Sequence, residues 1–282
     1  MLFSCRGIAK YYLQEPVIRE VDLELPEGGF ISLLGPSGVG KTTLFNILSG
    51  VDRPDEGRVF LEDDDITGVS GRVSYMLQKD LLLEFRTVLD NVILPLVIRG
   101  ETKRKARARA APFFPVFGLE GCETKYPREL SGGMRQRAAL LRTCLNAGLL
   151  AGTEPPPPDN AARRDGAGER PDGAGSGQAG EKKRGQVILL DEPFSALDAL
   201  TRRTMQEWYQ GISRDLGLST LFITHDAEEA VNLSDRVYIM TGRPGRIARI
   251  IDIEPPRPRP HSFAASAGFA RFKGLILDTL GI

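Results

Sequence analysis

The sequence predicts an α/β fold in which a mainly parallel sheet is covered by helices on both faces. Two observations lead to this prediction. Short apolar segments that suit strands alternate along the chain with longer segments that suit helices. In addition, a glycine-rich stretch joins one of these strands directly to an apolar helix. With 282 residues, of which 41% are hydrophobic, the chain has enough apolar material for a substantial core.

The strands are predicted from short apolar runs between turn-forming residues. The first run alternates apolar and polar residues, whereas the run from Val187 to Leu190 is apolar throughout, which is typical of a strand buried on both faces. In chain order the predicted strands are 21–25, 30–34, 73–77, 187–190, 220–223 and 237–240.

The helices are predicted from longer segments in which apolar residues recur at helical spacing. The segment after Leu200 ends just before Gly217, and the one after Asp226 begins with a residue type that caps helices. In chain order the predicted helices are 41–48, 88–98, 103–116, 134–145, 200–216 and 227–233.

Composition argues against several classes of protein. The net charge is zero and the isoelectric point is near 6.8, whereas a nucleic-acid-binding protein usually carries a basic excess. Cys5, Cys122 and Cys144 are widely spaced, which argues against a disulfide scaffold or a zinc site. No apolar run approaches the ~20 residues that span a bilayer. Arg6 and Lys10 lie where a signal peptide needs an apolar core, so we expect no secretory signal. We therefore expect a cytosolic chain unless a partner holds it at a membrane.

Two segments differ in composition from the rest. Residues 151–185 contain four consecutive prolines and eight glycines, but no Val, Ile, Leu, Met, Cys or aromatic residue. Such a segment cannot bury enough apolar surface to fold, so we predict a disordered insertion at about 148–185. From Pro255 the sequence PPRPRP predicts an extended connector, which leads to a short amphipathic segment at 263–280.

The strongest local motif is a phosphate-binding loop. The segment from Gly35 to Thr42 reads GPSGVGKT and fits the pattern GxxxxGK[ST] between a strand and a helix. Gly38 and Gly40 let the backbone curl so that its N–H groups face phosphate oxygens at the positive end of the helix. Lys41 supplies a charge for the β- and γ-phosphates, and the Thr42 hydroxyl can bind Mg²⁺. Nucleotide binding follows.

Two acidic residues follow the buried strand 187–190. Asp191 and Glu192 are expected at the carboxyl edge of the sheet, where ligands of α/β proteins bind. Asp191 is positioned to hold Mg²⁺ through water, and Glu192 to polarise the water that attacks the γ-phosphate. Alone, this pair is a weak signal, but the phosphate loop strengthens it.

A third motif, LSGGMRQR from Leu130 to Arg137, opens the helix upstream of the acidic pair. Its serine and adjacent glycines could form an anion cradle or a simple N-cap. In this order the three motifs resemble the ATP-binding cassette (ABC) transporter ATPases, over about residues 2–260. The resemblance implies the P-loop NTPase fold of that family, with a RecA-like core, an antiparallel β subdomain and an inserted helical subdomain. It further implies an ATPase domain at 1–255, with the helical subdomain at about 80–145 and a tail at 256–282.

The resemblance also implies the roles of further residues. Gln78 matches the Q-loop glutamine, a ligand of Mg²⁺ and water, and His225 matches the switch histidine that contacts the γ-phosphate. Tyr12 lies where the family stacks an aromatic ring on adenine, with Tyr11 as a neighbouring candidate. The remaining ATP-binding positions that it implies are Gly35, Pro36, Ser37, Val39 and Thr43. The signature residues, which contact the ATP of the partner subunit, are Ser131, Gly132, Gly133 and Gln136. The D-loop residues are Ser195, Ala196, Leu197 and Asp198.

The family arrangement implies a cycle driven by ATP and Mg²⁺. Two copies of the chain pair head to tail, and each ATP is held between the phosphate loop of one copy and the signature of the other. The segment from Gln78 to about Pro95 is expected to dock an integral-membrane permease at the cytoplasmic face of the membrane. A solute-binding protein would act indirectly, and no nucleic acid is expected.

Two stretches, Tyr75 to Leu96 and GRPGRI from Gly242 to Ile247, resemble importers of the nitrate, sulfonate and taurine type. The chain departs from that group at Glu84 and Phe85, where a Pro-Trp pair is common, and by the insertion. Two alternatives stay open, namely a non-transport ATPase of DNA repair or translation and an exporter ATPase. A scaffold with inactive motifs is disfavoured because Lys41, Asp191, Glu192 and His225 are all present. The transported solute stays open.

Overall fold

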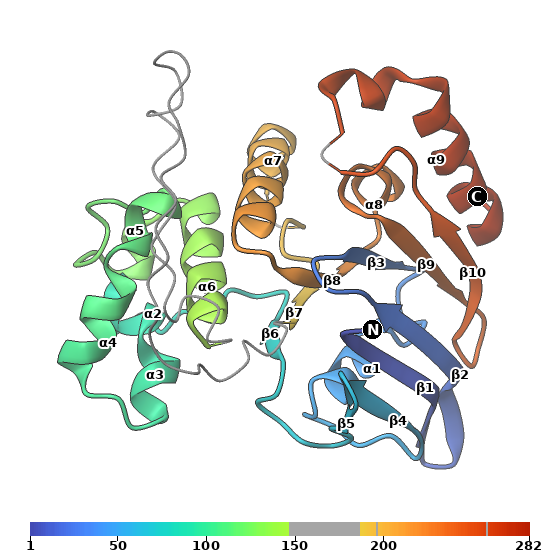
Figure 1. The fold of residues 1–282 in the computed structure, drawn as a ribbon, viewed down its shortest axis with the longest axis horizontal. Coiled ribbons are helices and arrows are strands. Elements are labelled where there is room, and N and C mark those ends of the chain that lie inside the picture. The colour runs from blue at the N-terminus through green and yellow to red at the C-terminus, as the bar shows by residue number, and fades with distance from the viewer. Residues whose placement is uncertain (147–186, 196, 258) are drawn as a thin grey trace, which may run out of the picture.

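The computed structural model describes residues 1–146, 187–195, 197–257 and 259–282 (Figure 1). The insertion predicted at about 148–185 and Ala196 of the predicted D-loop therefore lie outside the described residues.

The described strands form two sheets (Figure 1). The larger sheet has the order β10-β9-β3-β8-β7-β6, in which only the β10–β9 pair is antiparallel, and the smaller antiparallel sheet has the order β2-β1-β4-β5. Because β3, β6, β7 and β8 run parallel, their carboxyl ends meet at one edge. The strands are β1 (Phe3–Tyr12), β2 (Glu15–Leu25), β3 (Phe30–Leu34), β4 (Glu56–Leu61), β5 (Asp64–Asp65), β6 (Ser74–Met76), β7 (Val187–Asp191), β8 (Ser219–Thr224), β9 (Arg236–Thr241) and β10 (Arg246–Asp252).

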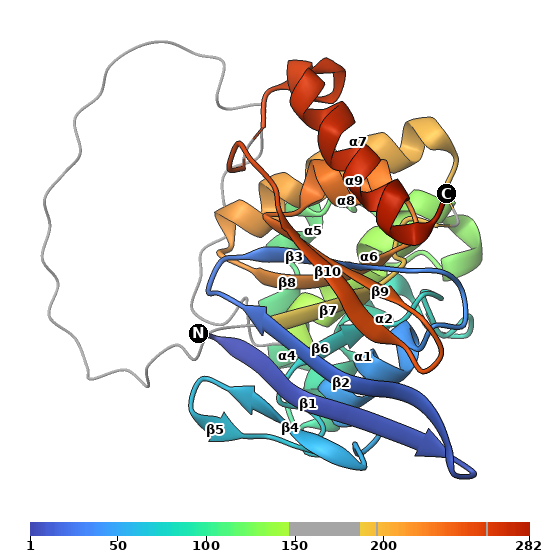
Figure 2. The same cartoon turned by 90° about the vertical axis from the view of Figure 1, so that its right-hand side faces the viewer.

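The helices fall into three groups. Helices α2 to α6 form a separate lobe, α1 lies beside the two sheets, and α7 to α9 lie on the other side of the larger sheet (Figures 1 and 2). The helices are α1 (Lys41–Leu48), α2 (Val88–Val92), α3 (Leu94–Ile98), α4 (Lys103–Ala110), α5 (Phe113–Val116), α6 (Gly132–Asn146), α7 (Ala199–Asp215), α8 (Ala227–Leu233) and α9 (Ala267–Leu280), with short 3₁₀ turns η1 (Pro127–Glu129) and η3 (His261–Ala265).

Two helices predicted as continuous are divided, so both predictions were wrong. The segment 88–98 forms α2 and α3, with Pro95 in the first turn of α3. The segment 103–116 forms α4 and α5, with Pro112 at the break. Proline lacks a backbone N–H and crowds the preceding turn, so it fits the start of a helix and not its interior.

Three apolar clusters hold these layers together. The first joins the helical lobe to one face of the larger sheet, and includes Phe113, Phe114 and Phe222. The second fills the space between the sheets and covers Leu44 and Phe45 of α1. The third lies between α8, α9 and strands β9 and β10. The second cluster buries the base of the phosphate loop and so fixes its position.

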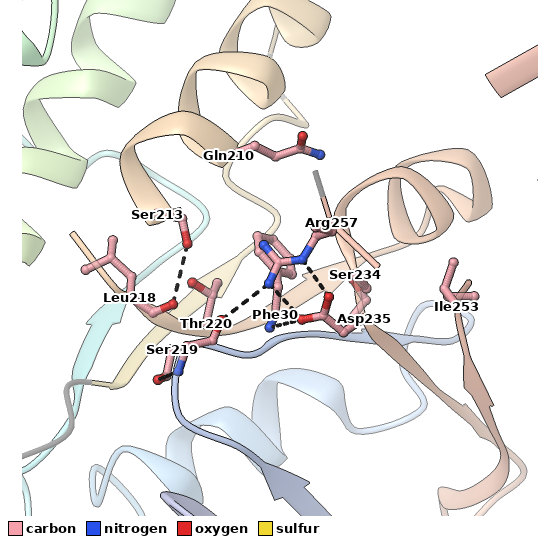
Figure 3. Close-up of polar contacts among 12 residues, drawn as sticks. Phe30, Gln210, Ser213, Leu218, Ser219, Thr220, Ser234, Asp235, Ile253 and Arg257 are labelled. Atoms are coloured by element: carbon pink, nitrogen blue, oxygen red, sulfur yellow. Dashed lines mark hydrogen bonds and ion pairs between the residues drawn. The ribbon is translucent and has the colours of Figure 1, made fainter. Parts of the chain in front are cut away.

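The C-terminal segment is attached to the core by two arginines. Arg257 donates to both carboxylate oxygens of Asp235 at 2.8 and 2.7 Å, and its guanidinium lies 5.2 Å from the ring centre of Phe30 (Figure 3). Arg259 donates to main-chain oxygens that include those of Val231 and Ser234 at the end of α8. The segment predicted to be amphipathic contains α9, whose Lys273 lies 2.6 Å from Glu228 of α8.

Within the described residues, no helix combines the length and the apolar character needed to cross a membrane.

Candidate functional site

The loop from Gly35 to Gly40 connects β3 to α1 and needs glycine at specific positions. Gly40 has a φ of 105°, and a Cβ atom there would lie 2.4 Å from Ile18 Cγ2. Gly38 has a φ of 79° with open space around it. Between them Val39 is buried in the core, whereas Pro36, Ser37 and Gly38 are exposed. The loop is therefore anchored at one side chain and presents its backbone outward, as an anion cradle requires.

Lys41, the first residue of α1, points back over this loop. Its buried ammonium group donates to the carbonyl oxygens of Gly35 at 2.7 Å and Pro36 at 3.0 Å. Burial lowers the pKa of Lys41, and the nearby carboxylates of Glu192 and Asp191 oppose that shift. The charge of Lys41 is thus placed above the cradle.

The structure brings Asp191 next to the second residue of α1. Asp191 Oδ2 accepts hydrogen bonds from Thr42 Oγ1 at 3.3 Å and from the Tyr75 hydroxyl at 3.2 Å. Burial is the largest cause that raises the pKa of Asp191, and the hydrogen bonds from Tyr75 and Thr42 counteract it. The sequence analysis missed Tyr75, because its role depends on the pairing of β6 with β7.

Glu192 lies between two other predicted residues. Its Oε2 atom accepts a hydrogen bond from Gln78 Nε2 at 3.2 Å and lies 3.2 Å from His225 Nδ1. Asp191, Glu192, Gln78 and His225 thus come from three different segments and lie at the carboxyl edge of the sheet, where the sequence analysis expected the two acidic residues.

The backbone of Glu192 is strained and held in place. Its φ of 45° is in the left-handed region, which costs a non-glycine residue about 1–3 kcal/mol. Its N–H donates to Ile223 O at 3.1 Å, and its carbonyl accepts from Ser195 Oγ at 2.9 Å. Ser195 of the predicted D-loop therefore holds the main chain of Glu192 in this conformation.

A buried carboxyl group that the sequence analysis missed lies behind His225. Glu229 of α8 is 8% exposed, accepts from Gln206 Nε2 at 2.7 Å and accepts a short hydrogen bond from Thr224 Oγ1. Burial raises the pKa of Glu229. Since Thr224 precedes His225, these bonds fix the turn that carries the histidine. The position of Glu229 three residues after the helix-capping Asp226 could have indicated this residue.

The signature residues lie elsewhere in the fold. Ser131 Oγ accepts from the N–H of Met134 at 3.3 Å and so caps the first turn of α6. A Cβ atom on Gly132 would lie 3.7 Å from Leu197 Cδ2, and one on Gly133 would lie 3.2 Å from Thr201 Cγ2. In the described part of the chain, no hydrogen bond or ion pair joins these signature residues to the phosphate loop.

The remaining predicted residues flank these groups. Gln136 is buried, and its Oε1 atom has no hydrogen-bond partner in the described structure. Asp198 caps α7 by accepting from the N–H of Thr201 at 3.1 Å. Hydrogen bonds from the side chain of Thr201, and then from its backbone, lower the Asp198 pKa. Tyr12 is 46% exposed, and its hydroxyl donates to Asp52 Oδ2 at 2.8 Å.

The residues around Asp191 fit a magnesium ion. Mg²⁺ prefers oxygen ligands, usually one or two protein groups together with substrate phosphates and waters. The Thr42 hydroxyl lies 3.3 Å from the Asp191 carboxylate, directly after the loop from Gly35 to Gly40. The donor set of hydroxyl, carboxylate and the Gln78 amide is therefore of the right chemistry.

Comparison with known proteins identifies relatives of this chain. Residues 18–151 match the family model described as ABC transporter. The formylaminopyrimidine import ATP-binding protein ThiZ of Halalkalibacterium halodurans is 37% identical over 234 residues, which cover 83% of this chain and 77% of the relative. The aliphatic sulfonates import ATP-binding protein SsuB 1 of Shouchella clausii is 36% identical over 262 residues, which cover 93% of this chain and 85% of the relative.

Solved structures share the fold. A dimeric structure of a bacterial ABC transporter cassette matches 90% of this chain and 100% of its own length, with a TM-score of 0.67 and 23% identity. A nucleotide-free ATP-binding cassette matches 90% of this chain and 92% of its own length, with a TM-score of 0.69 and 19% identity. These structures confirm the fold class predicted from the sequence.

Proposed function

The chain belongs to the ABC transporter family and is one of its ATP-hydrolysing cassettes, as the motifs predicted, and on that premise we propose that it energises a membrane importer of small solutes. The observation that carries the proposal is the meeting of Gln78, Glu192 and His225 beside Asp191 and Thr42. These are the residues that hydrolysis of a phosphate anhydride bond requires at one place.

The first step is to bind ATP. The outward-facing backbone of residues 36–40 would surround the β- and γ-phosphates, and Lys41 would exchange its contacts with Gly35 and Pro36 for phosphate oxygens. Tyr12 would offer its exposed ring to the adenine. Thr42, Gln78 and Asp191 would hold Mg²⁺, which when bound neutralises the charge of the phosphates.

The second step is to activate water. Glu192 would accept a proton from the attacking water, since its carboxylate faces the edge of the sheet and its backbone is fixed by Ser195 and Ile223. Gln78 and His225 both contact this carboxylate and would orient it. His225 would also contact the γ-phosphate. Hydrolysis therefore depends on three side chains that converge from separate loops.

The site also needs a second copy of the chain. Ser131, Gly132, Gly133 and the unpartnered Gln136 oxygen lie on the helical lobe, without a bond to the chain's own phosphate loop within the described residues. Paired head to tail, each copy would place this signature, with its D-loop from Ser195 to Asp198, against the ATP of the other. ATP would then hold the dimer together and hydrolysis would release it.

The proposed membrane partner docks beside Gln78. Leu94 and Pro95, at the end of the predicted docking segment, line a groove of about 310 Å³ together with Ile98 and Tyr75. An integral-membrane permease fits this position, and the chain would then sit at the cytoplasmic face of the membrane. The relatives named as importers of formylaminopyrimidine and aliphatic sulfonates support import of a small solute of that kind, with a solute-binding protein acting indirectly.

The test is to isolate the complex. The full chain, expressed with an affinity tag in its native cells, should copurify from detergent-solubilised membranes with a permease, and the ATPase rate of that complex should rise with loaded solute-binding protein. Purification of the chain without any membrane protein, or with a DNA-repair or ribosomal assembly, would contradict the proposal.

A further inference from the structure

The residue that the family motifs leave without a role is Tyr75, at the centre of the site. We propose that Tyr75 is a positioning residue whose hydroxyl fixes the Asp191 carboxylate in the orientation that binds Mg²⁺. This inference rests on the magnesium site of the proposed function.

The strand register places Tyr75 next to Asp191. Tyr75 pairs with Leu189 in the parallel β6–β7 pair. Side chains alternate along a strand, so Asp191, two residues beyond Leu189, points to the same face as Leu189. From β6, the long phenol side chain reaches across to that carboxylate and places its hydroxyl 3.2 Å from Oδ2.

The ring packs against α1 on one side and lines a groove on another. Its centre lies 5.9 Å from that of Phe45 of α1, with the rings at 72°, in an edge-to-face contact. The ring also lines the groove that contains Leu94 and Pro95. Because Phe45 lies in the same short helix as Lys41 and Thr42, the phenol is fixed relative to the phosphate loop.

The hydroxyl constrains which carboxylate oxygen is free. Tyr75 and Thr42 both donate to Oδ2, whereas Oδ1 accepts no hydrogen bond from the described residues. When Thr42 turns its oxygen toward the ion, Tyr75 is the donor that keeps the carboxylate from rotating. Its loss should therefore weaken Mg²⁺ binding more than it weakens binding of ATP alone.

The experiment is to compare Tyr75→Phe with the wild-type full chain in an equilibrium titration. The affinity for a fluorescent non-hydrolysable ATP analogue is measured at a series of free Mg²⁺ concentrations and again with excess EDTA. In Tyr75→Phe, we expect the Mg²⁺ concentration at half-saturation to rise on the order of tenfold. This is the loss of affinity expected when one hydrogen bond to a charged group is removed. The affinity in EDTA should stay within about twofold, because that contact acts only through the ion.

Two further variants separate this role from packing. Tyr238→Phe removes another buried phenol, one that contacts the main chain of Glu24 away from the site, and should bind Mg²⁺ as the wild type does. Tyr75→Leu removes the ring as well. A packing role predicts that Tyr75→Phe resembles the wild type and only Tyr75→Leu is impaired, which would overturn the proposal. A Tyr75→Phe chain that does not fold would overturn it too, since positioning leaves the fold intact. If wild-type binding did not depend on Mg²⁺ at all, the magnesium site of the proposed function would be wrong.

Discussion

Replacing Glu192 by glutamine tests the proposed hydrolytic step most directly. In the wild-type chain, Gln78 Nε2 lies 3.2 Å from the Glu192 carboxylate. The carboxamide of glutamine has the same shape, so its oxygen can still accept this hydrogen bond. Exchange of a charged for a neutral acceptor weakens such a bond by about 1 kcal/mol. Against this, the variant removes a negative charge that raises the pKa of the neighbouring Asp191. The free energy of unfolding should therefore change by no more than about 1 kcal/mol, a shift of about 2–4 °C in melting temperature.

Activity should respond far more strongly than stability. Loss of a general base typically lowers kcat by about 10² to 10⁴-fold. Phosphate release measures kcat, titration with a fluorescent ATP analogue measures affinity, and size-exclusion chromatography with saturating ATP measures dimer formation. Glu192→Gln should bind ATP, hydrolyse it slowly and accumulate as a dimer.

The control is Glu228→Gln on α8, where the carboxylate is 57% exposed and pairs with Lys273 at 2.6 Å. A surface pair contributes about 0–1 kcal/mol, so this variant should keep wild-type hydrolysis. The reasoning is refuted if Glu192→Gln keeps more than about a tenth of wild-type kcat, given the expected loss. A Glu192→Gln chain that stays monomeric in saturating ATP would refute the two-copy arrangement.

Other substitutions test separate parts of the site. Lys41→Ala should lose measurable ATP binding in the same titration, and wild-type affinity would contradict the phosphate-loop assignment. Gly40→Ala places a methyl group 2.4 Å from Ile18 and should lower the free energy of unfolding by more than the roughly 1–3 kcal/mol that backbone strain alone costs. Gly38→Ala adds its methyl group in open space and should lower that free energy less. Chemical denaturation measures both values. Because burial raises the folded pKa of Glu229, wild-type stability should fall as pH rises from its unfolded pKa through its folded pKa. Glu229→Gln should remove this pH dependence of stability. If the melting temperatures of the variant and the wild type change with pH in parallel, Glu229 is not its cause.

Sequence patterns determine some parts of this fold better than others. Buried parallel strands such as Val187–Asp191 are predicted closely, because an apolar run has few alternatives. The sequence analysis did not predict β1, β4, β5 or β10. Register shifts interrupt the pairing of β1, and β10 is an edge strand with mostly exposed or half-buried residues, so neither shows a clear alternation. The divided helices could have been predicted from Pro95 and Pro112 alone.

The site shows the same division. Residues that are predicted to bind phosphate through local loop geometry, such as Gly40 and Lys41, can be identified from contiguous sequence. Tyr75 cannot, since its contact with Asp191 depends on which strand pairs with β7 and in which register. Strand pairing of this kind is a tertiary property, and a motif that stops at Gln78 does not contain it.

Contacts between the segment after Gln78 and α6 connect the two halves of the proposed site. Arg142 of α6 donates to the carbonyl oxygens of Asp80 and Leu81, and Arg135 lies 3.3 Å from the Asp80 carboxylate. Gln78, two residues before Asp80, contacts Glu192. Because these bonds tie the main chain after Gln78 to the helix that begins at the signature, a displacement of Gln78 on hydrolysis would also displace that helix. The groove beside Leu94 and Pro95 includes Arg142 in its lining, so a partner bound there would act on the same contacts.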